Sequence, residues 1–207
     1  MSGPNDGEGG PQDLLHDLEL LIRSRYGLIH LVTDEEERAG TLLRHLADRL
    51  GVPLFAWSRT RGLARVDLEG SVYGSQEPAA ALQHVTDAGH PAVYHFQGLG
   101  PELERGPLVA EHLRDAGRTL EAVDGALVLT GADLAFPPVL ERLVARMELP
   151  GPGAEEFRRL LERILRDLSY RRSVEVEMTQ DEISALVNHL SGLTLMEAEK
   201  ILTKAIV

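Results

Sequence analysis

The sequence predicts an α/β protein, with a five-stranded parallel sheet and flanking helices followed by a small C-terminal helical subdomain. In residues 12–150, short apolar runs of strand length alternate with stretches whose apolar residues recur at helical spacing. Such alternation is typical of βαβ units, which place helices on both faces of a parallel sheet. After Gly151-Pro152-Gly153, which indicates a break between domains, only the helical spacing remains.

Composition divides the chain into three parts. Residues 1–11 are polar and rich in glycine and proline, so we expect a disordered tail there. This tail has neither the basic region nor the apolar region of a signal peptide. Residues 12–150 form the predicted α/β domain, and residues 151–207 form the predicted helical lid subdomain.

The first helix and the first strand open the α/β domain. A stripe of leucines predicts a helix at residues 12–25, and LIHLVT at residues 28–33 has the near-continuous apolar character of a strand covered on both faces. Asp34 is expected to cap the following helix, which Gly51 ends. Three glutamates occupy the first turn of that helix, where its dipole favours negative charge.

The later elements repeat this pattern. Further strands are predicted at residues 53–58, 92–96, 126–130 and 146–149, and helices at residues 78–88, 107–116 and just after 138. Residues 62–74 are expected to form a loop. In the helical subdomain, an apolar stripe predicts a helix at residues 155–168, and Thr179 with Glu182 and Thr194 with Glu197 have the spacing of capping boxes that open two more helices.

The composition also excludes several classes of function. The net charge of −12 argues against a nucleic-acid binder, which needs a basic stripe to displace counterions. No apolar run reaches the ~20 residues that span a bilayer. The lack of cysteine excludes disulfides and thiolate chemistry, which fits a reducing compartment. We therefore expect a cytoplasmic protein whose partners are proteins rather than nucleic acids or membranes.

A parallel sheet followed by a small helical lid is the plan of P-loop ATPases, and the turn after the first strand tests that function. A working phosphate loop reads GxxxxGK[ST], because glycines expose backbone N–H groups to the phosphates and the lysine neutralises their charge. Here the first strand continues into Asp34-Glu35-Glu36-Glu37-Arg38. No lysine precedes Lys200. This degenerate phosphate-loop position therefore predicts repulsion of a polyphosphate.

The end of the third strand gives a second test. A Walker-B acid would hold magnesium there, but the strand at residues 92–96 continues into QGLG, with no carboxylate before Glu102. We therefore predict no catalytic residue and no bound cofactor, with ATP and magnesium reached only through a partner or a parent module. His84, His90 and His95 lack the spacing of metal ligands, so no metal site is predicted either.

Five side chains are candidates for contacts with a partner: Trp57, Arg59, Arg61, Arg142 and Arg146. The single tryptophan could anchor an interface, although packing in the core is the simpler role. Arg59 and Arg61 flank the tip of the second strand and could face an anionic partner or remain solvated. The last two could act in trans on the nucleotide of a neighbour, as arginine fingers do, or form surface salt bridges.

Five segments resemble a group of bacterial, cyanobacterial and plastid AAA-family ATPases. They are LIRSRYGLIHLVTDEEER, LGVPLFAWSRTRGL, PAVYHFQGLGP, ALVLTGADLAFPPVLER and SGLTLMEAEKIL, which are spread along nearly the whole chain after the tail. In that group a degenerate ATPase-like domain precedes a second, competent AAA module. The resemblance implies an AAA-like α/β core with a helical lid. Gly98 and Gly100 stand where the family has Asp and His, and Thr130 and Asp133 fall at its sensor strand.

Three functional hypotheses follow. The first is a catalytically inactive protein-interaction, scaffold or regulatory module that docks on an AAA ATPase or on another copy of itself. The second is a part of an AAA ATPase that binds ATP in a noncanonical way or completes a composite site in trans. The third is an adaptor on an unrelated doubly wound sheet, which requires that no strand lie between the first and third strands.

Overall fold

The computed structural model describes residues 11–172 and 179–206. Contacts between residues divide the chain into two compact units, the first ending at Leu149 and the second beginning at Pro150. The predicted disordered tail lies outside the described residues, except for Pro11. That residue begins the first helix, α1 (Pro11–Arg23), so the helix starts one residue earlier than expected.

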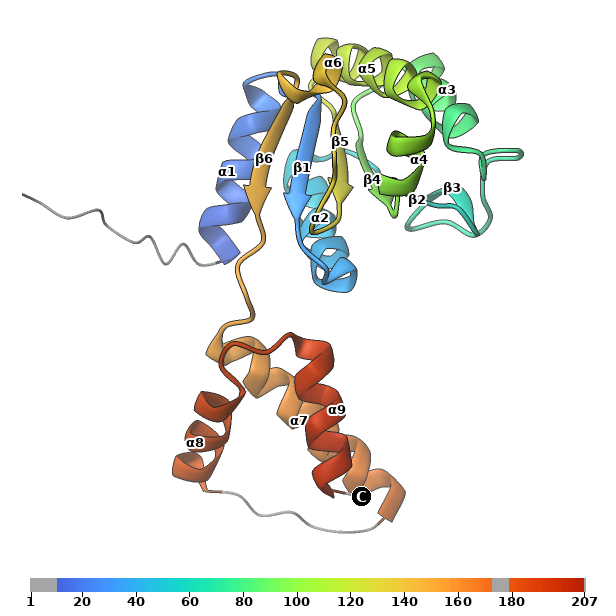
Figure 1. Cartoon of the computed structure of the whole chain (residues 1–207). Coiled ribbons are helices and arrows are strands. Elements are labelled where there is room, and N and C mark those ends of the chain that lie inside the picture. The colour runs from blue at the N-terminus through green and yellow to red at the C-terminus, as the bar shows by residue number, and fades with distance from the viewer. Residues whose placement is uncertain (1–10, 173–178, 207) are drawn as a thin grey trace, which may run out of the picture. The chain divides into compact units, whose positions relative to one another are not determined.

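A six-stranded sheet forms the centre of the first unit (Figure 1). Its strands are β1 (Leu28–Val32), β2 (Leu54–Ser58), β3 (Gly62–Arg65), β4 (Val93–Gln97), β5 (Ala126–Thr130) and β6 (Val144–Glu148). The order across the sheet is β3-β2-β4-β5-β1-β6, and all neighbours are parallel except β2 and β3. The five predicted parallel strands are therefore present, at bounds within two residues of those expected.

The predicted α/β fold class is confirmed, but the sheet has a sixth strand and one antiparallel pair, because residues 62–65 do not lie in a loop as expected. These four residues form β3, which pairs antiparallel with β2 in a hairpin. Gly62 follows the tight connection with a φ of +73°, a left-handed conformation that glycine adopts without steric cost. A strand of four residues with one arginine gives little alternating signal, so the sequence alone did not indicate it.

The strand order decides one of the three hypotheses. β5 lies between β1 and β4, which are the first and third strands of the sequence prediction. An inserted strand at this place is what the AAA resemblance implies. The hypothesis of an adaptor on an unrelated doubly wound sheet is therefore wrong.

Helices cover the two faces of the sheet unequally. On one face, α1 and α2 (Glu36–Leu50) bury an apolar cluster with alternate residues of the central strands. On the other face, α3 (Pro78–Ala88), α4 (Gly100–Arg105), α5 (Pro107–Ala122) and α6 (Pro138–Glu141) contribute to a larger cluster. The short helix α4 was not predicted, and α5 runs six residues past its expected end.

The two ends of α2 were predicted with different success. Gly51 ends the helix in a left-handed conformation at φ +70°, as expected. The expected cap by Asp34 was wrong, because Glu35 occupies the N-cap position and makes no side-chain capping hydrogen bond. The Thr33 hydroxyl oxygen instead accepts a hydrogen bond from the Glu35 N–H at 2.9 Å. This bond closes the turn before the helix begins.

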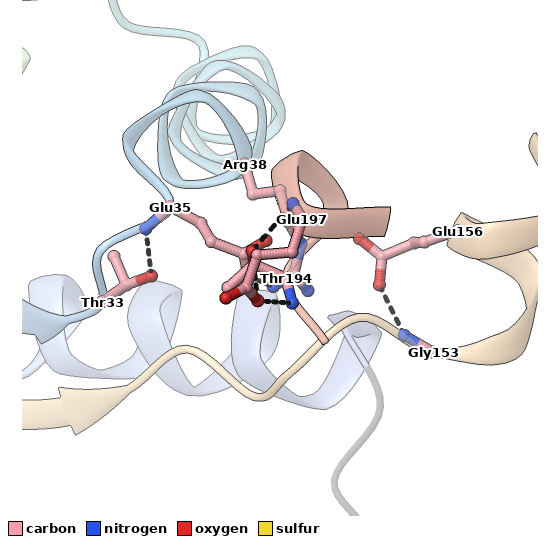
Figure 2. A network of polar contacts seen from close by, with 7 residues as sticks. All are labelled: Thr33, Glu35, Arg38, Gly153, Glu156, Thr194 and Glu197. Atoms are coloured by element: carbon pink, nitrogen blue, oxygen red, sulfur yellow. Dashed lines mark hydrogen bonds and ion pairs between the residues drawn. The ribbon is translucent and has the colours of Figure 1, made fainter. Parts of the chain in front are cut away.

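The second unit consists of α7 (Ala154–Arg172), α8 (Gln180–Leu190) and α9 (Leu195–Ile206), whose apolar faces form one cluster. Both predicted capping boxes are confirmed. The Glu182 carboxylate accepts the Thr179 N–H at 2.8 Å, and the Glu197 carboxylate accepts the Thr194 N–H at 2.9 Å. Figure 2 shows the second of these boxes. The two boxes fix where α8 and α9 begin.

Candidate functional site

A turn from Thr33 to Glu35 joins β1 to α2 at the carboxyl edge of the sheet. The Thr33 hydroxyl oxygen accepts the hydrogen bond from the Glu35 backbone N–H (Figure 2). A phosphate loop needs glycines that let several consecutive N–H groups point at the anion, and this turn contains none. The Glu35 N–H is therefore already engaged within the turn.

The charges at this turn oppose an anion. Glu35 forms an ion pair with Arg38, and the two side chains are 14% and 11% exposed. Asp34, Glu36 and Glu37 are exposed around the start of α2. In water, a unit charge about 4 Å from a phosphate oxygen contributes about 1 kcal/mol. Three exposed carboxylates therefore counteract the attraction that the positive end of the helix dipole would exert on a phosphate.

A buried pair of polar side chains joins the middle of β4 to the end of β5. The His95 ring lies 3.0 Å from the Thr130 hydroxyl, through Nε2, and both side chains are buried. Burial lowers the pKa of His95 to about 4, so the ring is neutral at pH 7. β4 ends at Gln97, and the following Gly98 has a φ of +67°. Neither the pair nor Gln97 supplies the carboxylate that a magnesium site would need.

A second buried histidine lies on β1. His30 Nε2 is 2.8 Å from the Gly131 carbonyl oxygen, which can only accept, so Nε2 carries the proton. Its ring meets Phe136 edge to face at 5.3 Å. Burial lowers the pKa of His30, and Arg146 on the neighbouring strand lowers it further. These contacts indicate a structural residue that fixes the loop after β5.

Trp57 has the packing role in this structure. Its side chain is 1% exposed and stacks on Phe96 with ring centroids 5.1 Å apart. The indole Nε1–H donates a hydrogen bond to the Ser75 carbonyl oxygen at 2.7 Å. A role for Trp57 as an interface anchor would require the core to open, so the structure does not favour it.

The four candidate arginines lie in different settings. Arg59 bridges Glu77 at 3.2 Å and Glu102 at 2.9 Å, while Arg61 is exposed in the β2–β3 hairpin. Arg142 is exposed at the end of α6, beside the start of β6. Arg146 is exposed within β6, opposite His30 of β1. Arg61 lines the same hollow as Glu36 and Glu37 at the start of α2, and contact of the four arginines with a partner remains a prediction.

Sequence reasoning did not find the hydrogen-bonding roles of the two buried histidines. His95 was interpreted as a solvated or core residue, and His30 was not singled out. The available signal was a histidine at the middle of two otherwise apolar strands, where a buried polar ring needs a partner. Within residues 11–172 and 179–206, there is no cluster of three metal-type side chains, and no helix is long and apolar enough to cross a membrane.

Comparison with known protein families agrees with the AAA-like strand order of the sheet. The family profile described as "SpoVK-like AAA ATPase, N-terminal domain" matches residues 14–149, which is more than half of the chain. The chain belongs to the SpoVK-like AAA ATPase family. The profile of the family's second domain matches residues 155–207. The AAA resemblance predicted from the sequence is thereby confirmed.

Curated relatives of this SpoVK-like chain include uncharacterized AAA domain-containing proteins named ycf46. The protein from Trieres chinensis is 21% identical over 193 residues, and that from Guillardia theta is 23% identical over 193 residues. Each alignment covers 92% of this chain but 37% of the relative. The chain therefore spans less than two fifths of the length of these relatives.

Solved structures show the same fold. The FIGL-1 AAA domain in complex with ADP aligns with a TM-score of 0.62 and 12% identity, covering 96% of this chain and 70% of that one. Caenorhabditis elegans PCH-2 aligns with a TM-score of 0.59 and 10% identity, covering 93% and 62%. A chain of the Escherichia coli MS115-1 HORMA:CdnC:Trip13 complex gives 0.59 and 14%, covering 95% and 81%. At these identities the likeness establishes the AAA fold alone.

Proposed function

We propose that this chain is a catalytically inactive AAA-fold module that acts through protein contacts. It docks on an AAA ATPase or on another copy of itself, as a scaffold or regulatory domain. ATP and magnesium reach it only through a partner or a parent module. The proposal also places it in the cytoplasm, with no nucleic-acid or membrane partner.

The observation that carries this proposal is the β1–α2 turn. The AAA sheet order is intact, but the turn that should hold phosphates is short, lacks glycine and is surrounded by exposed carboxylates. The end of β4 also supports the proposal, because this strand ends without a carboxylate and its His95 side chain is neutral at pH 7. Since each part of a phosphoryl-transfer site has a specific role, loss of the loop and the acid together removes both phosphate and magnesium binding.

Docking can be measured directly. The chain is mixed with a competent AAA ATPase module of a SpoVK-like family member, and its mass is determined by size-exclusion chromatography with light scattering, alone and in the mixture. The proposal predicts a discrete complex, either with the module or between copies. A chain that stays monomeric at high micromolar concentration in both samples would overturn it.

A second candidate function is a composite ATPase site completed in trans. It is supported by Arg142 and Arg146, which are exposed and make no ion pair with any other described residue. The start of β6 lies at the amino edge of the sheet, opposite the β1–α2 turn, so Arg142 could reach only a neighbour's nucleotide. The test is the ATPase rate of the competent module with wild-type chain, with R142A and R146A, and with the exposed R118A on α5 as control. A loss confined to the first two variants would establish this function.

A further inference from the structure

An open hollow lies on the α2 face of the sheet, over β2 and β3. Its volume is about 750 Å³, and it is bounded by α2 on one side and by residues 66–71 on the other. Residues of β2, β3 and β4 form its floor. Neither of the two apolar clusters of the first unit fills this space.

The hollow exists because one face of the sheet carries too few helices. Strands lie about 4.8 Å apart and a helix is about 10 Å wide, so two helices cover about four strands. The cluster under α1 and α2 includes residues of β6, β1, β5 and β4, but only Leu54 of β2 and none of β3. The opposite face of the same strands is covered, since Trp57 and Leu63 pack in the larger cluster.

The floor allows close approach of another backbone. Ala56 of β2 lies opposite Ala64 of β3, and Ser58 lies opposite Gly62, so these paired positions carry only small side chains on the strands. Next to them His95 contributes a neutral, buried ring. A surface of small residues and hydrogen-bonding groups suits a helix that packs on a sheet at short distance, as α2 does on the neighbouring strands.

The walls of the hollow carry charged side chains. Arg44 on α2 and Arg61 on the hairpin both line it, are exposed, and make no ion pair with another described residue. They stand out in a chain of net charge −12. Glu36 and Glu37 line one end, at the start of α2. Leu68, 62% exposed, adds apolar surface on the opposite wall from α2.

We infer that this hollow is the docking site for an amphipathic helix of a partner protein that carries carboxylates along its flanks. The carboxylates pair with Arg44 and Arg61, and the small apolar residues of the helix lie on Ala56 and Ala64. The amino terminus of the docked helix, which bears partial positive charge, lies beside Glu36 and Glu37. This inference rests on the proposed function, since it names the surface and the chemistry of one protein contact.

The test uses the full chain and a pair of synthetic helical peptides of 14 residues. One has leucine and alanine on its apolar stripe and glutamate at the flanking positions, and the other has lysine in place of every glutamate. Binding is followed by amide chemical shifts in the ¹⁵N-labelled protein. The acidic peptide is expected to bind at least tenfold more tightly at low salt, to lose that advantage at high salt, and to shift amides of β2 and β3.

Variants of the chain locate the contact. R44E and R61E should each weaken binding of the acidic peptide about tenfold, and A64W should weaken it at least as much by filling the hollow. R118E on α5 and A122W at its end are the matched controls, since both positions are exposed and lie outside the hollow. Equal binding of the two peptides, no binding of either, or shifts that map elsewhere would overturn the inference.

Failure of this inference can be told apart from failure of the proposed function. If the chain forms a complex with an AAA module while the acidic peptide does not bind, only the hollow is misassigned. If the chain binds or hydrolyses ATP by itself, the inactive module is wrong whatever the peptides do.

Discussion

Acid destabilisation through His95 is a direct consequence of its burial beside Thr130, between β4 and β5. Burial lowers the pKa of His95 from 6.5 to about 4 in the folded chain, whereas in the unfolded chain the ring returns to its ordinary value. Between these two values the unfolded state binds more protons than the folded state. Stability therefore falls as the pH drops below about 6.5, and the loss is complete near pH 4.

The size of the effect follows from the two pKa values. A tenfold difference in proton affinity corresponds to about 1.4 kcal/mol, so full protonation removes about 3 kcal/mol from the free energy of unfolding. About 2 kcal/mol of this is lost by pH 5, and almost none above pH 7. For a domain whose total stability is about 5–15 kcal/mol, such a loss is easily measured.

The assay compares wild type with H95Q in urea unfolding at pH 7.5 and pH 5.0. Trp57 is the single tryptophan and packs against Phe96, so its fluorescence reports on the sheet unit alone. Glutamine stays neutral and can still hydrogen-bond Thr130, so the substitution removes the proton-binding ring and keeps a polar partner at this place. H95Q should lose about 2 kcal/mol less than wild type between the two pH values. An equal loss in the free energy of unfolding of wild type and H95Q between the two pH values would refute the reasoning.

Three further predictions concern packing and caps. S75A removes the hydroxyl that accepts the buried Leu63 N–H at 2.8 Å and should cost about 2 kcal/mol in urea unfolding, with S71A at an exposed loop position as control. G117A would place its Cβ 2.6 Å from Leu28 Cγ in the core and should cost about 1–3 kcal/mol, a stabilised protein being the contrary result. T194A removes one capping box and should lower helix content by circular dichroism and cost about 1 kcal/mol; no change on either measure would contradict the role of the cap.

Much of the fold could be predicted from local patterns. The strand at residues 126–130 and the helix at residues 78–88 have the predicted bounds, because one is a continuous apolar run and the other has Pro78 at its start and Gly89 after its end. The two capping boxes were read from threonine and glutamate three residues apart. Each of these signals is contained within a few residues, so no tertiary contact is needed to detect it.

The missed features depend on residues far apart in sequence. His95 and Thr130 are 35 positions apart in the sequence, and no local pattern indicates that their side chains form a pair. The face on which Trp57 lies could not be told from LFAWS, since β2 is half-buried on both sides. The hollow over Ala56 and Ala64 is created by a helix that is missing from one face, which only the strand order reveals. Small residues in two short strands carry no signal of their own.

The central claim is that the AAA scaffold of this chain persists without a nucleotide site. Isothermal titration of the purified chain with ATP and Mg²⁺, at protein concentrations of about 100 μM, tests it most directly. The account predicts no saturable heat, because carboxylates and an engaged backbone N–H stand where phosphates would bind. A saturable one-to-one binding curve whose affinity changes on substitution of Asp34 or Arg38 would contradict it.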